Sequence, residues 1–210
     1  MKYVPNVKNT APTSILDELS VLKNKLVWTI LGIIIIGFGG VFCVYTYIAD
    51  TILEVTHTPA YTISIAMIMF GIGCTLGNYL LGKAADHSPL KTTGAALIGA
   101  VVFAASYVSA SHNIWLLYAV IFFIGFSVGL GTVIQSLLMD VSPQGHAMIG
   151  ALVQCAFNTA NAIGPWLGGM AIAEGALPSQ TGYVSAALFL GGFLMWSLSA
   201  MQMKRQSCKP

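Results

Sequence analysis

The chain has 210 residues, of which 56% are hydrophobic and only 8% are Asp, Glu, Lys or Arg, and its mean hydropathy is +0.80. A soluble domain of this size normally has about a quarter of its residues charged, so the composition excludes a water-soluble globule and favours the lipid bilayer as solvent. The net charge of +2 is small, and no basic patch interleaved with aromatic residues supports nucleic-acid binding, so we expect no nucleic-acid partner.

Six apolar segments follow along the chain, each close to the roughly 20 residues that a helix needs to cross about 30 Å of hydrocarbon. They are Leu26–Ala49, Ala60–Gly82, Thr92–Ser109, Ile114–Met139, Met148–Ala173 and Tyr183–Met203. None of them has a charged side chain in its middle, where insertion is costly. The predicted fold is therefore an all-α membrane protein with six transmembrane helices.

Three regions make up the predicted domain organisation. Residues 1–25 form a cytoplasmic linker, in which Pro12–Asn24 has the apolar spacing of a short surface helix. Residues 26–203 form the transmembrane domain, and residues 204–210 form a cytoplasmic tail.

The distribution of basic residues predicts the orientation in the membrane. All nine Lys and Arg residues lie in the N-terminal segment, in the connection between the second and third spans, or in the C-terminal tail. The opposite connections hold only the acidic residues Asp50, Glu54 and Glu174. Since Lys and Arg stay on the cytoplasmic side, we expect a multi-pass protein of the inner or plasma membrane with both termini in the cytoplasm.

A weak internal repeat relates the second span to the fifth. Gly77, Leu80, Gly82 and Ala84 recur 87 positions later, as Gly164, Leu167, Gly169 and Ala171. Because these two helices would cross the membrane in opposite directions, the pattern predicts two inverted three-helix repeats, an arrangement common among transporters.

Glycine pairs with G-x-x-x-G spacing occur in three of the spans, at Gly73/Gly77, Gly125/Gly129 and Gly164/Gly168. Small residues four positions apart let two helix backbones approach closely, so the pairs predict helix contacts.

The segment from Gly125 to Gly129 also matches the G-x-S-x-G pattern of hydrolases, but it lies inside an apolar helix. All four histidines lie in loops or at helix ends, so no base is available to activate a nucleophile. The four cysteines are scattered, which indicates free thiols. We therefore expect neither an enzyme nor a cofactor or metal site.

The fifth span has a polar face. Gln154, Asn158 and Asn161 are spaced i, i+4, i+7 and share that face, and Gly164 and Pro165 beyond them predict a helix bend. The stripe is either the wall of a solute pathway or a set of interhelical hydrogen bonds, and the sequence leaves both open.

Two further residues outside the fifth span are candidates for the pathway. Tyr45 near the end of the first span and Gln135 near the end of the fourth both carry polar groups that are costly to expose to lipid.

The connection between the second and third spans is expected to form a structural gate. It contains Gly82, Lys83, Asp86 and Lys91, in which the glycine allows close approach and the lysines are able to pair with the carboxylate.

The sequence resembles the second half of a major facilitator superfamily transporter, in the drug/proton antiporter branch that includes arabinose- and sugar-efflux proteins. The resemblance covers nearly the whole chain and rests on Asp17–Leu22, Tyr45–Ile48, Gly71–Asn78, Gly82–Asp86, Phe157–Pro165 and Gly168–Gly169. It implies a proton-driven exporter of small solutes such as sugars or drug-like molecules, with Gly82, Lys83 and Asp86 in a cytoplasmic loop motif.

The chain departs from that family in two respects. His87 occupies the position after Asp86 that is usually arginine, and six spans stand where the family has twelve. No Asp or Glu lies in the middle of a span, so no residue of the chain is an evident proton carrier.

Three hypotheses follow from these departures. The chain is a half-length transporter that needs a second six-helix half, a transporter that assembles as a homodimer, or a non-transporting membrane scaffold or inactive remnant.

Overall fold

The computed structural model describes residues 21–142 and 146–207, and within these ranges every regular element is helical. The elements are η1 (Val21–Lys23), α2 (Lys25–Gly32), η2 (Ile33–Phe38), α3 (Gly39–Thr46), α4 (Ile48–Asp50), η3 (Thr51–Val55), α5 (Tyr61–Ala85), α6 (Pro89–Ala110), α7 (Ile114–Phe126), η4 (Ser127–Gly129), α8 (Leu130–Val141), α9 (His146–Ala173), η5 (Pro178–Gln180) and α10 (Thr181–Ser207). Elements η2 and η3 are π-helical, whereas η1, η4 and η5 are 3₁₀ turns. Of the predicted surface helix Pro12–Asn24, residues 12–20 lie outside the described residues, and Val21–Lys23 forms the 3₁₀ turn.

Five helical stretches in the described part of the chain are long and apolar enough to cross a membrane. They are Lys25–Thr46, Tyr61–Ala85, Pro89–Ala110, Ile114–Val141 and Pro178–Arg205, and they match five of the six predicted spans to within a few residues. The remaining predicted span corresponds to α9, which is 28 residues long but not apolar enough by composition. Its polar residues lower its hydropathy, so its membrane crossing stays a prediction.

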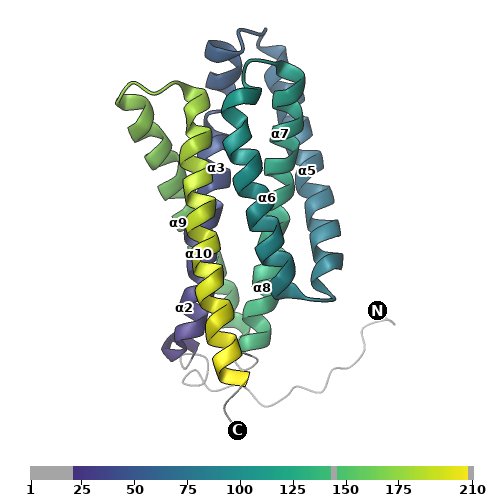
Figure 1. Ribbon diagram of the computed structural model, residues 1–210, viewed down its shortest axis with the longest axis vertical. Helices are drawn as coiled ribbons and strands as arrows, with labels where there is room; N and C mark the ends of the chain where they lie inside the picture. The colour runs from purple at the N-terminus through teal and green to yellow at the C-terminus, as the bar shows by residue number, and fades with distance from the viewer. Residues whose placement is uncertain (1–20, 143–145, 208–210) are drawn as a thin grey trace, which may run out of the picture.

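The helices form one bundle whose two ends differ in charge (Figure 1). The start of α2 and the end of α10 lie together, because Lys23, Lys25 and Arg205 line one cavity between them. The connection between α5 and α6, with Lys83 and Lys91, is at the same end in Figure 1. We call this the basic end.

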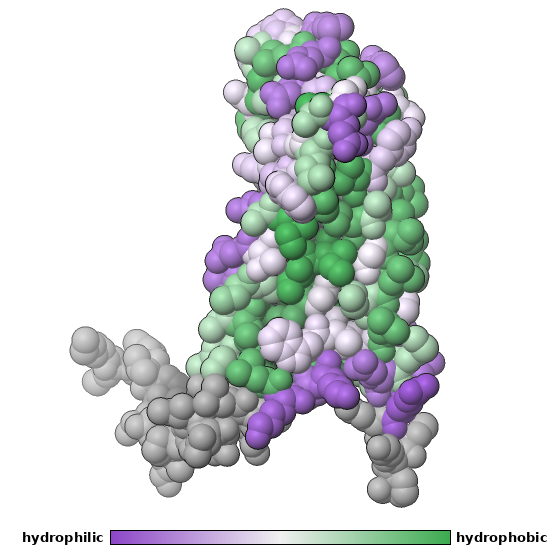
Figure 2. Space-filling model, turned by 90° about the vertical axis from the view of Figure 1, so that its left-hand side faces the viewer, coloured by the Kyte–Doolittle hydropathy of each residue, from purple (hydrophilic) through white to green (hydrophobic). Residues whose placement is uncertain are grey.

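The opposite end carries acidic residues. Asp50 and Glu54 lie in α4 and η3, and Glu174 follows α9, all at the far end of the bundle from the basic end (Figure 1). Figure 2, which views the left-hand side of Figure 1, shows mostly hydrophobic residues between two hydrophilic ends, with some hydrophilic residues at the left edge near mid-height. This distribution is the one that a bilayer imposes on a spanning protein.

Local sequence signals explain where the helices begin. Asn24 and Asn113 accept hydrogen bonds from the backbone N–H groups of Leu26 and Trp115, both at 3.0 Å, and so cap α2 and α7. Helix α6 begins with Pro89, whose missing N–H is not needed in the first turn.

Helices α5 and α7 are in backbone contact through the predicted glycine pairs. A methyl group at Gly73 would collide with the carbonyl of Phe122, and one at Gly77 would collide with the carbonyl of Phe126. From the other side, Gly125 meets the backbone of Phe70. The glycine pairs Gly73/Gly77 and Gly125/Gly129 therefore serve one interface, as small residues do between helices in lipid.

Helices α9 and α3 are in contact through the third glycine pair. Gly164 lies against the carbonyl of Gly39, and Gly168 lies against Cys43 and the ring of Tyr47. The Tyr47 hydroxyl also donates a hydrogen bond of 2.9 Å to the carbonyl of Pro165.

These two glycine contacts are related by the repeat in the sequence. Gly77 contacts Phe126 and Gly164 contacts Gly39, and the two glycines and their two partners are each separated by 87 positions. The contact of the second span with the fourth is thus matched by the contact of the fifth with the first.

Helix α10 is held against its neighbours by polar contacts. The Ser185 hydroxyl donates a hydrogen bond of 2.7 Å to the carbonyl of Gly40, and Trp196 Nε1 donates one of 2.8 Å to the carbonyl of Leu90. The Trp196 ring also lies against Gly94 of α6. These contacts place α6 and α10 side by side.

Replacing Gly73 by alanine tests the contact between α5 and α7. The new methyl group collides with a backbone carbonyl, so we expect a loss of about 1–3 kcal/mol of stability. Gly71 is the matched control, because a methyl group there meets no atom within 4 Å. The thermal unfolding midpoint in detergent should fall for Gly73→Ala and be kept or raised for Gly71→Ala. Equal midpoints for the two variants would contradict the assigned interface.

Candidate functional site

A cavity of about 450 Å³ lies between the first, second, fourth and fifth predicted spans. Four of the five predicted pathway residues, Tyr45, Gln154, Asn158 and Asn161, line it. Its other lining residues are Phe38, Val41, Phe42, Phe70, Cys74, Val128 and Phe157. The lining contains no Asp, Glu, Lys, Arg or His, so the cavity is uncharged.

The amide side chains of α9 have no partner within the described part of the chain. Gln154, Asn158 and Asn161 are all exposed in the isolated chain, and none makes a side-chain hydrogen bond to a described residue. By contrast, the exposed Asn78 of α5 donates a hydrogen bond of 2.9 Å to the carbonyl of Cys74. The stripe therefore does not tie α9 to another described helix, and its hydrogen-bonding groups are free to meet water or a solute.

Aromatic rings form much of the apolar lining of this cavity. Phe38 and Phe157 meet edge to face with their ring centroids 4.7 Å apart, and Tyr45 lies against Phe70 at 4.9 Å. Tyr45 is 44% exposed, and its hydroxyl has no hydrogen bond to a described residue. The cavity thus combines apolar ring surfaces with several unpaired polar groups, as small-molecule sites commonly do.

The aromatic residues of the first span lie where the helix changes from π-helical to α-helical. The π-helical segment Ile33–Phe38 ends at the first cavity residue, Phe38. Phe42 and Tyr45 follow at spacings of four and three positions and so lie on the same face of α3. Short π-helical segments are frequent at functional sites, because they shift the faces of the residues that follow them.

Gln135 is not part of this cavity. It lies half-buried on α8, and none of the cavities described here includes it. Its position on the fourth span agrees with the prediction, whereas its part in a pathway stays a prediction.

Gly164 and Pro165 lie beyond the amide stripe, toward the acidic end of α9. Helix α9 runs from His146 to Ala173 without a break at Pro165. Gly164 is buried in its contact with Gly39, so the structure gives this glycine a packing role. The predicted bend stays a prediction.

The residues of the predicted gate do not all lie in one site. Gly82 and Asp86 line a second cavity of about 460 Å³, together with Thr132, Ser136 and Asp140 of α8. Lys83 and Lys91 are exposed, and neither forms an ion pair with Asp86 in the described part of the chain. The structure therefore places a second carboxylate, rather than a lysine, in the same cavity as Asp86.

The apolar residues that line the amide-bearing cavity were not predicted from the sequence, apart from Tyr45. Phe38, Phe42 and Tyr45 have the same i, i+4, i+7 spacing that identified the amide stripe. Aromatic residues in an apolar span are usually lipid-facing or core residues, so this spacing alone did not distinguish a cavity wall. Phe157 precedes Asn158 directly and was the clearest available signal.

The serine of the G-x-S-x-G pattern is a structural residue. Ser127 is buried, and its hydroxyl donates a hydrogen bond of 2.6 Å to the carbonyl of Ile124. The described cysteines Cys43, Cys74 and Cys155 are free thiols, as expected.

Comparison with known proteins identifies the family. The model of the Major Facilitator Superfamily matches residues 29–207. The chain is 31% identical over 196 residues to the "Uncharacterized MFS-type transporter YfhI" of Bacillus subtilis (strain 168), an alignment that covers 93% of this chain and 48% of that protein.

Two further relatives carry descriptive names. The "Inner membrane transport protein YdhP" of Escherichia coli (strain K12) is 28% identical over 159 residues, which cover 75% of this chain and 41% of that protein. The "Probable sugar efflux transporter" of Helicobacter acinonychis (strain Sheeba) is 25% identical over 177 residues, which cover 83% of this chain and 45% of that protein. The chain thus spans about half the length of the curated relatives that it matches.

The family match, which covers most of the chain, confirms the resemblance found in the sequence and agrees with the long apolar helices of the bundle. The chain therefore belongs to the Major Facilitator Superfamily, as a multi-pass membrane protein of a transporter family and not an enzyme.

Proposed function

We propose that this chain forms the second, six-helix half of a transporter that exports small uncharged solutes, and that the cavity between α3, α5 and α9 is part of the solute pathway. The observation that carries the proposal is the set of three unpaired amides at Gln154, Asn158 and Asn161 in a helix of membrane-spanning length. An unpaired polar group facing hydrocarbon costs several kcal/mol, so these amides require water, a solute or a second protein surface.

The chemistry of the lining indicates the class of solute. Ring surfaces from Phe38 and Tyr45 suit an apolar face, and the amides of Asn158 and Asn161 suit hydroxyl or carbonyl groups. Because the lining holds no charged side chain, a neutral sugar or a neutral drug-like molecule fits better than an ion. The sugar efflux name of one relative supports the sugar.

Six spans with both ends in the cytoplasm complete the proposal. In this arrangement α9 is the fifth span and the basic end of the bundle faces the cytoplasm, with residues 1–25 as linker and 204–210 as tail. The matched contacts of Gly77 with Phe126 and Gly164 with Gly39 support two inverted three-helix repeats.

Proton coupling is proposed to depend on residues outside this chain. The described acidic residues Asp50, Glu54, Asp86, Asp140 and Glu174 lie at helix ends or in connections, and none lines the amide-bearing cavity.

A second six-helix unit is proposed to cover the open side of the cavity. Helix α5 exposes an apolar stripe at helical spacing, made of Tyr61, Ile65, Ile68, Ile72, Leu76 and Tyr79. The occupant is the first half of a full-length transporter or a second copy of this chain. A scaffold function is less well supported, because the amide stripe forms no hydrogen bonds between described helices.

Asn158→Leu and Asn161→Leu are expected to weaken the binding of a neutral solute. Each lost hydrogen bond to an uncharged ligand is worth about 0.5–1.5 kcal/mol. The affinity of the double variant should therefore fall by roughly tenfold or more. Equilibrium binding of radiolabelled glucose and lactose to the protein in detergent measures this, with the cation ethidium as comparison.

Thr159→Val is the matched control on the same helix. The Thr159 hydroxyl bonds to the carbonyl of Cys155 and does not line the cavity, so binding should be unchanged. Preferential binding of ethidium, or full glucose and lactose binding by the double variant, would refute the proposed solute class and site.

Thiol labelling tests the orientation. In a variant without native cysteines, Glu174→Cys should react with a membrane-impermeant maleimide in intact cells. Lys83→Cys and Arg205→Cys should react only after the cells are permeabilised, because the basic end is predicted to face the cytoplasm. Labelling of Lys83→Cys in intact cells would reverse the assignment.

Cysteine crosslinking tests the second unit. Ile72→Cys on α5 should form a crosslinked dimer if the chain pairs with itself, or a crosslink to a co-expressed first half if it does not. Ile98→Cys on α6 is the control, since Ile98 is similarly exposed but lies outside the α5 stripe. Equal crosslinking from both positions would argue against a specific interface on α5.

A further inference from the structure

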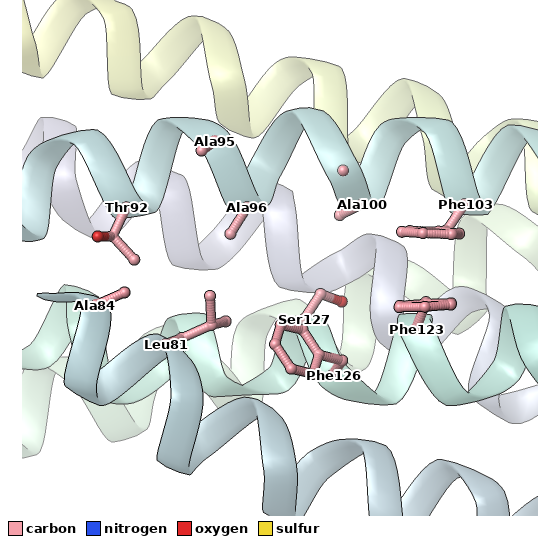
Figure 3. A pocket seen from close by; sticks show the side chains of 11 residues that line it. Leu81, Ala84, Thr92, Ala95, Ala96, Ala100, Phe103, Phe123, Phe126 and Ser127 are labelled. Atoms are coloured by element: carbon pink, nitrogen blue, oxygen red, sulfur yellow. The ribbon is translucent and has the colours of Figure 1, made fainter.

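A third cavity is lined almost entirely by apolar residues and includes none of the amide stripe. It has a volume of about 350 Å³ and is bounded by α5, α6 and α7 (Figure 3). Along α6 it extends from Thr92 to Phe103, a length of roughly 16 Å at the rise of an α-helix. It shares no lining residue with the amide-bearing cavity.

Stacked aromatic rings close one end of this cavity. Phe103 and Phe123 are nearly parallel, with an interplanar angle of 5° and ring centroids 4.1 Å apart. At the other end, Thr92 and Ala84 lie nearest the connection between α5 and α6 (Figure 3). The cavity therefore runs from the basic end toward the middle of the bundle and stops there.

The outer side of the cavity is open and apolar. Ala84 and Ala95 in its lining are exposed, and Phe123 is 39% exposed. The neighbouring residues Ile98 and Val102 of α6 are more than half exposed. In a membrane protein such a surface faces lipid, and an apolar groove left empty there would forfeit dispersion contacts.

The open mouth carries an unpaired positive charge. Lys91 precedes Ala95 and Gly99 at intervals of four residues, so it lies on the cavity face of α6 one turn closer to the basic end. It is exposed and forms no ion pair within the described residues. The hydroxyl of Thr92 also makes no hydrogen bond to a described residue, and it points toward this end of the cavity (Figure 3).

We propose that this groove binds one molecule of an anionic phospholipid, with an acyl chain between α5, α6 and α7 and the phosphate beside Lys91 and Thr92. The length of the groove is about half of the roughly 30 Å hydrocarbon core, which is the reach of an acyl chain in one leaflet. Lysines at the headgroup level favour anionic over zwitterionic lipids. Asp86, the nearest acidic residue in the sequence, lines a different cavity with Asp140.

Native mass spectrometry of the full chain in mild detergent tests the proposal. Phosphatidylglycerol and phosphatidylcholine with identical acyl chains are supplied in equal amounts. The wild-type protein should retain one phosphatidylglycerol in preference to phosphatidylcholine by about fivefold, the contribution expected of one lysine at the membrane surface.

Two pairs of variants separate the acyl chain from the headgroup. Gly99→Leu places a side chain in the groove and should lose both lipids, since an added Cβ there meets no atom within 4 Å. Gly71→Leu is its control on α5, where an added Cβ is equally unobstructed. Lys91→Gln should equalise the two lipids, whereas Lys25→Gln, which removes a charge at the same end of the bundle, should keep the preference.

Crosslinking locates the site in the unmodified protein and does not depend on how the variants fold. Phosphatidylglycerol with a diazirine in its acyl chain should label the segments 92–103 and 123–127. Labelling spread evenly over the exposed helices would overturn the proposal. The proposal would also be overturned if Gly99→Leu retained phosphatidylglycerol at the wild-type level while its unfolding midpoint equalled that of Gly71→Leu.

Discussion

Close contact between helix backbones at glycine is the interaction on which the rest of this structure depends. Gly77 against Phe126 fixes α5 on α7, and Gly164 against Gly39 fixes α9 on α3. In lipid the hydrophobic effect does not drive helices together, so close van der Waals contact has to do so. These two helix contacts position α5 and α9, and residues of both helices line the amide-bearing cavity.

Several polar side chains elsewhere in the bundle hold helices together, and the amides of that cavity do not. Ser185, Trp196 and Tyr47 each donate a hydrogen bond to a backbone carbonyl of another helix. The amides of Gln154, Asn158 and Asn161 make no such bond to a described residue. The three amides share one face of α9 and line one cavity, which is why the proposed solute pathway is placed there.

Much of the bundle was predictable from the sequence, because apolar length and glycine spacing act locally. Five of the six expected spans are helices long and apolar enough to cross a membrane, and each G-x-x-x-G pair lies at a helix contact. The grouping of Tyr45 with the amide stripe was also anticipated, whereas Gln135 is outside the cavity. The π-helical conformation of Ile33–Phe38 was not predictable from the sequence, because apolar residues suit both α- and π-helices. The separation of Asp86 from Lys83 and Lys91 depends on how α5 meets α8, which a loop sequence does not encode.

The two matched glycine contacts allow one half of the bundle to be compared with the other. Gly77 and its partner Phe126 correspond to Gly164 and its partner Gly39, each 87 positions away. The effects of substitutions at one contact can therefore be compared with those at the other within a single polypeptide, under identical lipid, temperature and expression. Differences between the two sets of effects then measure how the surroundings of each contact change the cost of the same substitution.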